Sequence, residues 1–146
     1  MSDDRGGGMA LREVRHVSAS IARDWCEIYE AFWRPEAFPR WASGLSQSRL
    51  IPDGPDFLAR GPEGDVRIRF TPHNSFGVMD HVVTLADGSR VDIPLRIVPN
   101  GAGAEVTLTL FRQPGMDEAT FARDAEWVAR DLAALKRLAE AGGAAP

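Results

Sequence analysis

Apolar side chains recur at helical spacing in two segments of the chain. In the first segment they fall at i, i+3, i+4 and i+7, namely Trp25, Ile28, Tyr29 and Phe32. This spacing predicts a short amphipathic helix that ends before Pro35, followed by a second short helical turn in EAFPRWASGL. In the second segment they lie three or four residues apart, namely Phe121, Ala125, Val128, Leu132, Leu135 and Ala139. With Asp117 as its N-cap, this pattern predicts a helix over residues 117–141, about 37 Å long.

Strand-length segments fill the rest of the chain. Residues 11–17 predict a first strand ahead of the helices, and the turn sequences PDGPD, PEGD, TPHNSFG, ADGS and PNGAG divide residues 46–112 into about six more. Strands gathered between helices, rather than alternating with them, are typical of the α+β class. We therefore expect a curved antiparallel sheet of about seven strands, two short helices after the first strand, and a long C-terminal helix.

The turn sequence ADGS sets the expected register of the sheet. Asp-Gly favours a two-residue hairpin loop, so Asp87 and Gly88 would bring Thr84 opposite Val91. One face would then hold Val78, Asp80, Val82 and Thr84 opposite Ile97, Leu95, Ile93 and Val91. Strict alternation adds Val66, Ile68, Phe70, Val106, Leu108 and Leu110 to this face. The other face would carry Met79, His81, Val83 and Leu85 with Arg67, Arg69, Arg90, Asp92, Pro94 and Arg96. A slip of one residue would exchange these faces.

The apolar stripe of the C-terminal helix has to be buried, and the apolar sheet face is the surface large enough to bury it. A chain of 146 residues fits one domain whose core has room for a cavity. We expect this domain to cover residues 11–141, between flexible ends at residues 1–10 and 142–146.

Composition narrows the classes of partner. The formal net charge of −4 has the wrong sign for a protein that neutralises phosphates, so we expect no nucleic acid partner. No apolar run approaches the roughly 18 residues that span a bilayer, and the acidic N-terminus is unlike a secretory signal. A lone Cys26 forms no internal disulfide. We expect a cytoplasmic protein without membrane contact, either monomeric or homodimeric.

Several motifs resemble one known superfamily. A strand, a helix pair ending in FPRW, a meander with FGVMDH, RIVPNG and TLFRQPGM, and a last helix with VARDLAALKRL are similar to the START/SRPBCC superfamily. The nearest likeness, over roughly residues 11–140, is to its small bacterial polyketide cyclase/dehydrase-like members. The resemblance implies a helix-grip fold with a cavity between the concave sheet and the last helix. That superfamily includes carriers, receptors and cyclases, so the fold alone does not give a function.

Two charged residues on the expected inner face are candidates for ligand contacts. Asp80 would be a carboxylate on an apolar face, which makes it a ligand anchor, a general base, or a structural acceptor of backbone hydrogen bonds. Arg112 could receive an acidic or carbonyl group, or simply pair with Asp117 or Glu118 at the rim. His81 follows Asp80 directly, and adjacent strand residues point to opposite faces, so the two cannot act together. His73 lies in a loop that could reach the cavity mouth.

Large rings and aliphatic side chains supply the expected cavity wall. With the two charged residues, the predicted ligand-binding set is Trp41, Phe57, Phe70, Phe76, Val78, Asp80, Leu95, Leu108, Arg112 and Trp127. For each ring alone, ordinary core packing is the simpler interpretation. Neither a nucleophile motif nor metal-ligand spacing is present, so we expect no metal and no cofactor. The leading hypothesis is binding of a small hydrophobic or aromatic molecule. The alternative is a cyclase or dehydratase that uses Asp80 or a loop histidine as acid/base.

Overall fold

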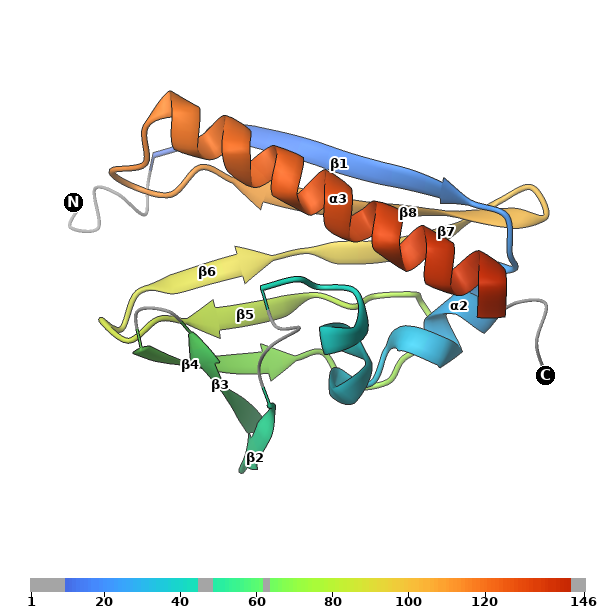
Figure 1. The fold of residues 1–146 in the computed structure, drawn as a ribbon, viewed down its shortest axis with the longest axis horizontal. Coiled ribbons are helices and arrows are strands. Elements are labelled where there is room, and N and C mark those ends of the chain that lie inside the picture. Colours follow the sequence, from blue (N-terminus) through green and yellow to red (C-terminus); the bar gives the residue numbers. More distant parts are fainter. Residues whose placement is uncertain (1–9, 45–48, 62–63, 143–146) are drawn as a thin grey trace.

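The computed structural model describes residues 10–44, 49–61 and 64–142 (Figure 1). In chain order its elements are β1 (Val14–Ile21), α2 (Trp25–Phe32), η1 (Pro35–Arg40, a 3₁₀-helix), β2 (Ile51–Asp53), β3 (Asp56–Gly61), β4 (Gly64–Phe70), β5 (His81–Thr84), β6 (Arg90–Ile93), β7 (Leu95–Asn100), β8 (Gly103–Phe111) and α3 (Glu118–Gly142). The predicted α+β class, the two short helices after the first strand and the long last helix are confirmed. The described residues form eight strands where about seven were expected. The predicted flexible ends lie almost entirely outside the described residues and stay predictions.

The strands form two antiparallel sheets that meet at one extended stretch of chain. Their orders are β2-β3-β4-β5-β6 and β1-β8-β7, and β6 and β7 are separated only by Pro94. Proline has no N–H to donate, so the ladder is interrupted there and the stretch changes its main partner from β5 to β8. Pro94 keeps one link to β8, because its carbonyl accepts from the Thr109 amide at 3.0 Å.

A glycine holds the two sheets together beside this junction. Gly77 has a φ of +71°, and its carbonyl accepts a hydrogen bond from the Ile97 amide at 2.9 Å. A Cβ at this position would lie 2.2 Å from the Ile97 carbonyl oxygen, so only glycine permits the approach. The segment that leads into β5 therefore runs alongside β7, and the strands form one curved surface.

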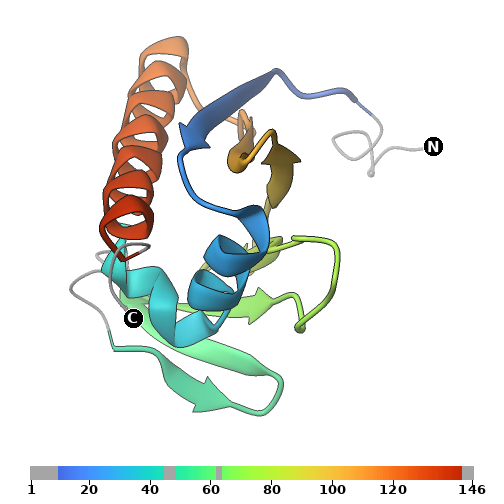
Figure 2. The same cartoon turned by 90° about the vertical axis from the view of Figure 1, so that its right-hand side faces the viewer.

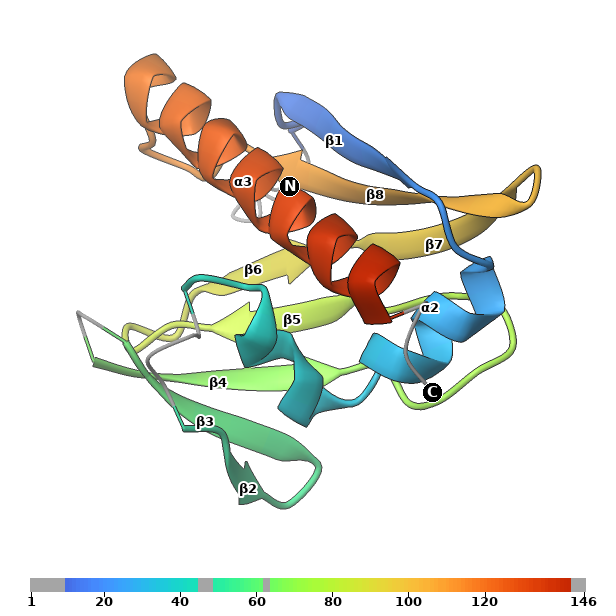
Figure 3. The ribbon, with the colours of Figure 1, turned by 45° about the vertical axis from the view of Figure 1, so that its right-hand side comes forward.

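Helix α3 lies on the concave side of this surface. Seen from the end in Figure 2, the strands follow an arc from β1 through β8 and β7 to β4 and β3, and α3 lies across its open side. In Figure 3, α2 and η1 lie beside the C-terminal part of α3. Asp117 caps α3 as predicted, since its carboxylate accepts from the Thr120 amide at 2.8 Å. Asp24 caps α2 in the same way through the amides of Cys26 and Glu27.

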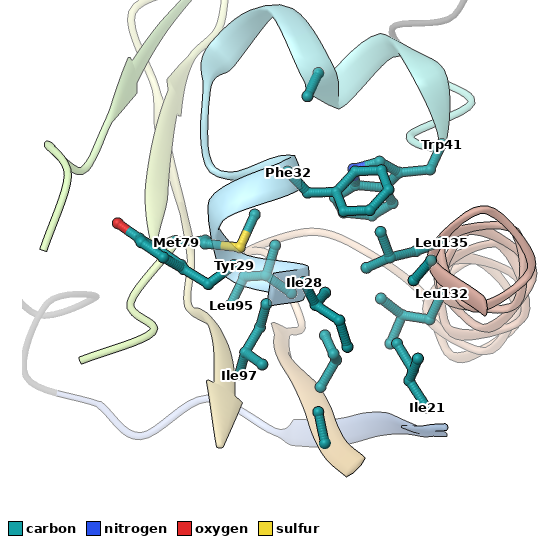
Figure 4. Packing of buried hydrophobic residues seen from close by; sticks show 14 of the residues in the cluster. Ile21, Ile28, Tyr29, Phe32, Trp41, Met79, Leu95, Ile97, Leu132 and Leu135 are labelled. Carbon is teal, nitrogen blue, oxygen red and sulfur yellow. The ribbon is translucent and has the colours of Figure 1, made fainter. Parts of the chain in front are cut away.

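Burial of α2 under α3 makes the densest part of the core. Figure 4 shows Leu132 and Leu135 of α3 pointing toward the cluster that contains Ile28 and Phe32 of α2 and Trp41. Leu135 and Ile28 have no exposed surface, and Phe32 has 2%. At about 25 cal/mol per Å² of apolar area, burial of side chains of this size is the main stabilising contribution.

The first strand begins and ends later than predicted. Residues 11–17 were expected, but β1 pairs with β8 from Val14, opposite Phe111, to Ile21, opposite Ala104. The pairing stops there because β8 ends at Phe111, although the Glu13 carbonyl still accepts from the Arg112 amide at 2.9 Å. The strand continues past residue 17 because its small polar residues occupy the outer face, where Ser18 bonds with Thr107 at 3.0 Å.

The register of the β5–β6 hairpin also differs from the prediction, by one residue. Leu85 pairs with Ser89 through its amide at 2.8 Å, which leaves a three-residue loop of Ala86, Asp87 and Gly88. Gly88 has a φ of +91°, the left-handed residue that closes a three-residue loop. Val83 therefore lies opposite Val91, and Val82 lies opposite Asp92.

This slip exchanges the two faces of β5 and leaves the other strands as predicted. Leu95, Ile97, Val106 and Leu108 are buried on the inner face, where they were expected. On β5, His81 and Val83 face inward, whereas Asp80, Val82 and Thr84, which were expected inside, belong to the outer side.

Candidate functional site

A cavity of about 290 Å³ lies between the N-terminal half of α3, η1 and the inner face of the sheet. Its lining is almost wholly apolar: Phe38, Trp41, Ala42, Gly44, Val66, Ile68, His81, Val83, Val91, Asp92, Ile93, Leu108, Thr109, Leu110, Phe111, Trp127, Val128 and Asp131. Asp92 and Thr109 alternate with inward-facing neighbours, so their side chains point outward and they contribute backbone. Under the C-terminal half of α3 the same space is filled by α2. The cavity is therefore the part of the interior that no helix fills.

Aromatic rings form the end of the cavity next to η1. The Phe38 ring lies 5.5 Å from that of Trp41 and 4.7 Å from that of Phe70. His81 packs edge-on against Phe38 at 5.1 Å and is stacked on Phe70 at 5.5 Å. Phe57 contacts Phe70 from behind, at 5.8 Å. A flat molecule entering the cavity would meet ring faces and edges on this side.

His81 is the polar side chain within this aromatic end. Its Nδ1 lies 3.1 Å from the Met79 carbonyl oxygen, and a carbonyl can only accept, so Nδ1 carries the proton. Burial among apolar groups lowers the pKa of His81, although the Met79 carbonyl and the Asp80 carboxylate act in the opposite direction. The imidazole is therefore neutral at pH 7, with a lone pair on Nε2.

A second polar group lies on α3, where Asp131 meets the segment after η1. The Ser43 hydroxyl donates to Asp131 Oδ1 at 2.7 Å, and the Trp127 indole N–H donates to Ser43 Oγ. Burial raises the pKa of Asp131, and the hydrogen bonds from Ser43 partly offset this. Trp127 lines the cavity and yet is 47% exposed, so the cavity opens to solvent beside it.

Asp80 lies outside the cavity, which corrects the face expected from the turn. It accepts from the Leu95 amide at 2.8 Å and from Arg96 Nη2 at 2.8 Å, on the outer side of the sheet. Burial alone would raise the pKa of Asp80, but the hydrogen bonds from Arg96 and Leu95 outweigh it and lower this pKa. Asp80 is thus the structural acceptor of backbone hydrogen bonds that was one of the three expected interpretations. Its carboxylate links the segment before β5 to β7 across the sheet junction.

Arg112 lies at the rim of the molecule rather than at the cavity. Its guanidinium donates to Glu13 at 2.9 Å, to Glu118 at 2.8 Å and to the Met116 carbonyl at 2.9 Å. Hydrogen bonding to Glu13 raises the pKa of Arg112, which is charged in any case. Arg112 lies one residue beyond the end of β8, and the expected alternative of a rim pair with Glu118 describes its environment.

The remaining predicted residues divide into three groups. Trp41, Leu108 and Trp127 line the cavity. Phe57, Phe70 and Leu95 pack behind its wall or in the core. Phe76 and Val78 do not reach the cavity: the Phe76 ring is 75% exposed, and Val78, which the register placed inside, pairs with Arg96 on the outer side. His73 does not reach the cavity either, because its Nε2 lies 2.7 Å from Glu30 and its ring packs on Trp33.

The wall residues that sequence reasoning missed include Phe38, His81, Val83 and Asp131. Phe38 lay in a segment too broken by proline for a periodic signal. The slipped register assigned His81 to the wrong face. Asp131 follows Trp127 by four residues on α3, and this spacing places both on one helix face. Within the described residues no group of three or more His, Cys, Asp or Glu side chains could hold a metal ion.

Comparisons with known proteins match this architecture and not the sequence. No protein-family model matches the chain, and no curated protein matches it. XoxI from Bacillus cereus is similar in structure with a TM-score of 0.67 and 12% identity, over 86% of this chain and 94% of that one. The Aha1 dimer from Colwellia psychrerythraea gives 0.64 and 14%, over 89% and 98%. The fold is a helix grip.

A third similar structure belongs to a biosynthetic locus. DynU16, a protein of the dynemicin biosynthetic locus, has a TM-score of 0.67 and 15% identity, over 90% of this chain and 49% of that chain. The helix-grip chain therefore corresponds to about half of DynU16. Identities this low show a shared fold and leave the ligand open.

Proposed function

We propose that this protein is a START/SRPBCC-type binding protein that holds a small hydrophobic or aromatic molecule in the cavity between the sheet and α3. The observation that carries this proposal is the 290 Å³ of unfilled space with an almost wholly apolar lining. Protein interiors are normally close-packed, so apolar walls without a filling side chain forgo contacts that a bound apolar molecule would supply. The volume lies near the lower end of the roughly 300–1,000 Å³ range of ligand pockets, which suits a molecule of two or three rings.

The cyclase or dehydratase alternative, which assigned acid/base catalysis to Asp80 or a loop histidine, gains no support from where these residues lie. It requires Asp80 or a loop histidine at the bound molecule, and both Asp80 and His73 are engaged with other residues away from the cavity. The presence of DynU16 in a biosynthetic locus favours a small-molecule role in general, not a reaction. We therefore propose binding, with reaction chemistry as an outcome that the ligand's identity would reveal.

We also propose that the chain acts as a monomer or a homodimer in the cytoplasm. The similar Aha1 structure is a dimer, which favours neither state for this chain but makes self-association a reasonable expectation. No helix within the described ranges is long and apolar enough to cross a membrane.

Native mass spectrometry of the protein purified from its source organism tests the proposed function. We expect a non-covalent adduct of one small molecule per chain, released on denaturation. A parallel thermal-shift screen with neutral aromatic and aliphatic compounds should raise the unfolding temperature for some of them. An adduct-free protein that no compound stabilises would contradict the proposal.

A further inference from the structure

The polar side chains that face the cavity can both accept hydrogen bonds. Only His81 and Asp131 of its described lining residues present a titratable side chain to it, and no lysine or arginine lines it. An ionised carboxylate is purely an acceptor, and a neutral imidazole has one acceptor nitrogen. The hydrogen-bonding character of the wall therefore depends on which nitrogen of His81 is available.

The acceptor nitrogen of His81 is the available one. Nδ1 is committed as a donor to the Met79 carbonyl, so Nε2 holds the lone pair. Nε2 makes no hydrogen bond with any described residue, because the one hydrogen bond of this ring is made by Nδ1. Since the His81 ring lines the cavity, Nε2 is the ring nitrogen left to bond a molecule held there.

The possible donors around the cavity are either used or shielded. The indole N–H of Trp127 donates to Ser43 Oγ, and the Ser43 hydroxyl in turn donates to Asp131. Trp41 lines the cavity, but its Nε1 is buried, so the ring contacts the cavity through carbon. The wall thus presents acceptors and a carboxylate, without a free donor or a cation among the described side chains.

We infer that the cavity selects flat, uncharged apolar molecules that carry a hydrogen-bond donor, such as a phenolic hydroxyl, which donates to His81 Nε2, and that it rejects anions. This inference rests on the proposed function and names its ligand class. A ligand without a donor leaves the lone pair of His81 unpaired in an apolar wall, which costs affinity. A carboxylate ligand meets no cation to compensate its lost hydration and is repelled by Asp131.

Three probes that share one ring system test this selection by isothermal titration at pH 8: naphthalene, 2-naphthol and 2-naphthoate. We expect 2-naphthol to bind about tenfold more tightly than naphthalene, the effect of one hydrogen bond in an apolar site. We expect 2-naphthoate to bind at least about tenfold more weakly than naphthalene.

Variants identify the residues responsible. His81→Phe keeps a ring and removes the acceptor, so it should reduce 2-naphthol to the affinity of naphthalene while naphthalene itself still binds. His16→Phe is the control, because His16 is exposed and bonds with Thr109 on the outer face. Asp131→Asn should relieve the penalty on 2-naphthoate. Asp124→Asn is its control, since Asp124 is on α3 but does not line the cavity.

The outcomes separate this inference from the proposed function. If none of the three probes binds, the inference is wrong, and the native mass spectrometry and the thermal-shift screen decide separately whether the proposed function fails as well. If naphthalene and 2-naphthol bind equally, or His81→Phe leaves their ratio unchanged, the cavity binds ligands but the inference is wrong. Tightest binding of 2-naphthoate would also overturn the inference and would indicate a cation that the described wall does not contain.

Discussion

The two faces of strands β4 to β7 are built on the same backbone. They differ in whether their polar side chains have hydrogen-bonding or ionic partners. On the outer face the charged groups have partners, as in the pairs of Arg69 with Asp56 at 2.6 Å and of Arg96 with Asp80 at 2.8 Å. On the inner face His81 keeps an unpaired acceptor beside unfilled space. Paired charges on a sheet are structural, whereas an accessible, unpaired polar group in an apolar wall indicates a place for a ligand.

Two adjacent valines on β5 give the most direct test of the difference between the two faces. Val83 lines the cavity and Val82 lies on the outer face. Val83→Trp should fill the cavity and weaken binding of a neutral probe such as N-phenyl-1-naphthylamine by at least about 100-fold, equivalent to about 2.7 kcal/mol. Fluorescence titration of the folded variant measures this loss.

The matched variant Val82→Trp adds the same side chain to the opposite face. It should leave the affinity for the probe within about twofold of the wild type. Equal loss of binding in both variants would mean that bulk anywhere on β5 disturbs the protein. Loss of probe binding in Val82→Trp alone would mean that Val82 faces the cavity. That result would support the register with a two-residue loop and contradict the structure.

Asp80 tests the structural role of the outer face. Asp80→Ala removes the acceptor of the Leu95 amide and the partner of Arg96, and we expect a loss of about 2 kcal/mol in the free energy of unfolding. Urea denaturation measures it. Probe affinity of the folded variant should not change, and a large change would show that Asp80 acts at the ligand after all.

Two variants calibrate that measurement. Asp92→Ala removes an exposed carboxylate 3.5 Å from Arg90 and should cost less than about 0.5 kcal/mol. Asp80→Asn keeps an acceptor for the Leu95 amide and should fall between the two. Because the pKa of Asp80 is lowered, its contribution is present at neutral pH and is lost as the pH falls through that lowered pKa.

The pH dependence of His81 is the smallest expected effect. Burial lowers its pKa, so below about pH 6.5, the ordinary value for an imidazole, the unfolded chain binds a proton that the folded protein does not. The free energy of unfolding should therefore fall as the pH drops below that value. We expect this decrease to be smaller than the one caused by Asp80→Ala. His81→Phe should remove this part of the loss in urea titrations at several pH values. An NMR titration of His81 with a midpoint above pH 6.5 would contradict the buried environment.

The fold was predictable because its elements carry strong and independent signals. The stripe from Phe121 to Ala139 and the cap at Asp117 specify α3 without reference to the sheet. On β6, β7 and β8, most apolar residues share one parity, with Val98 and Phe111 as exceptions, so alternation placed Leu95, Ile97 and Leu108 correctly.

The site was only partly predictable because β5 lacks that asymmetry. Val82 and Val83 are equally apolar, so the loop alone had to decide which one faces inward. Asp-Gly fits the two-residue loop, and it equally fits a three-residue loop in which Gly88 is the left-handed residue. The hydrogen bond from Leu85 to Ser89 selects the second, and no local signal in the sequence distinguishes them.

The three-residue loop also has an evolutionary consequence. A deletion or insertion of one residue between Leu85 and Ser89 would turn β5 over, and Val82 and Thr84 would replace His81 and Val83 in the wall. Such a change would replace an imidazole by a hydroxyl in one mutational step, with the rest of the scaffold retained. Among relatives that share this architecture, differences in the length of this hairpin tip should mark changes of ligand more reliably than substitutions within the strand.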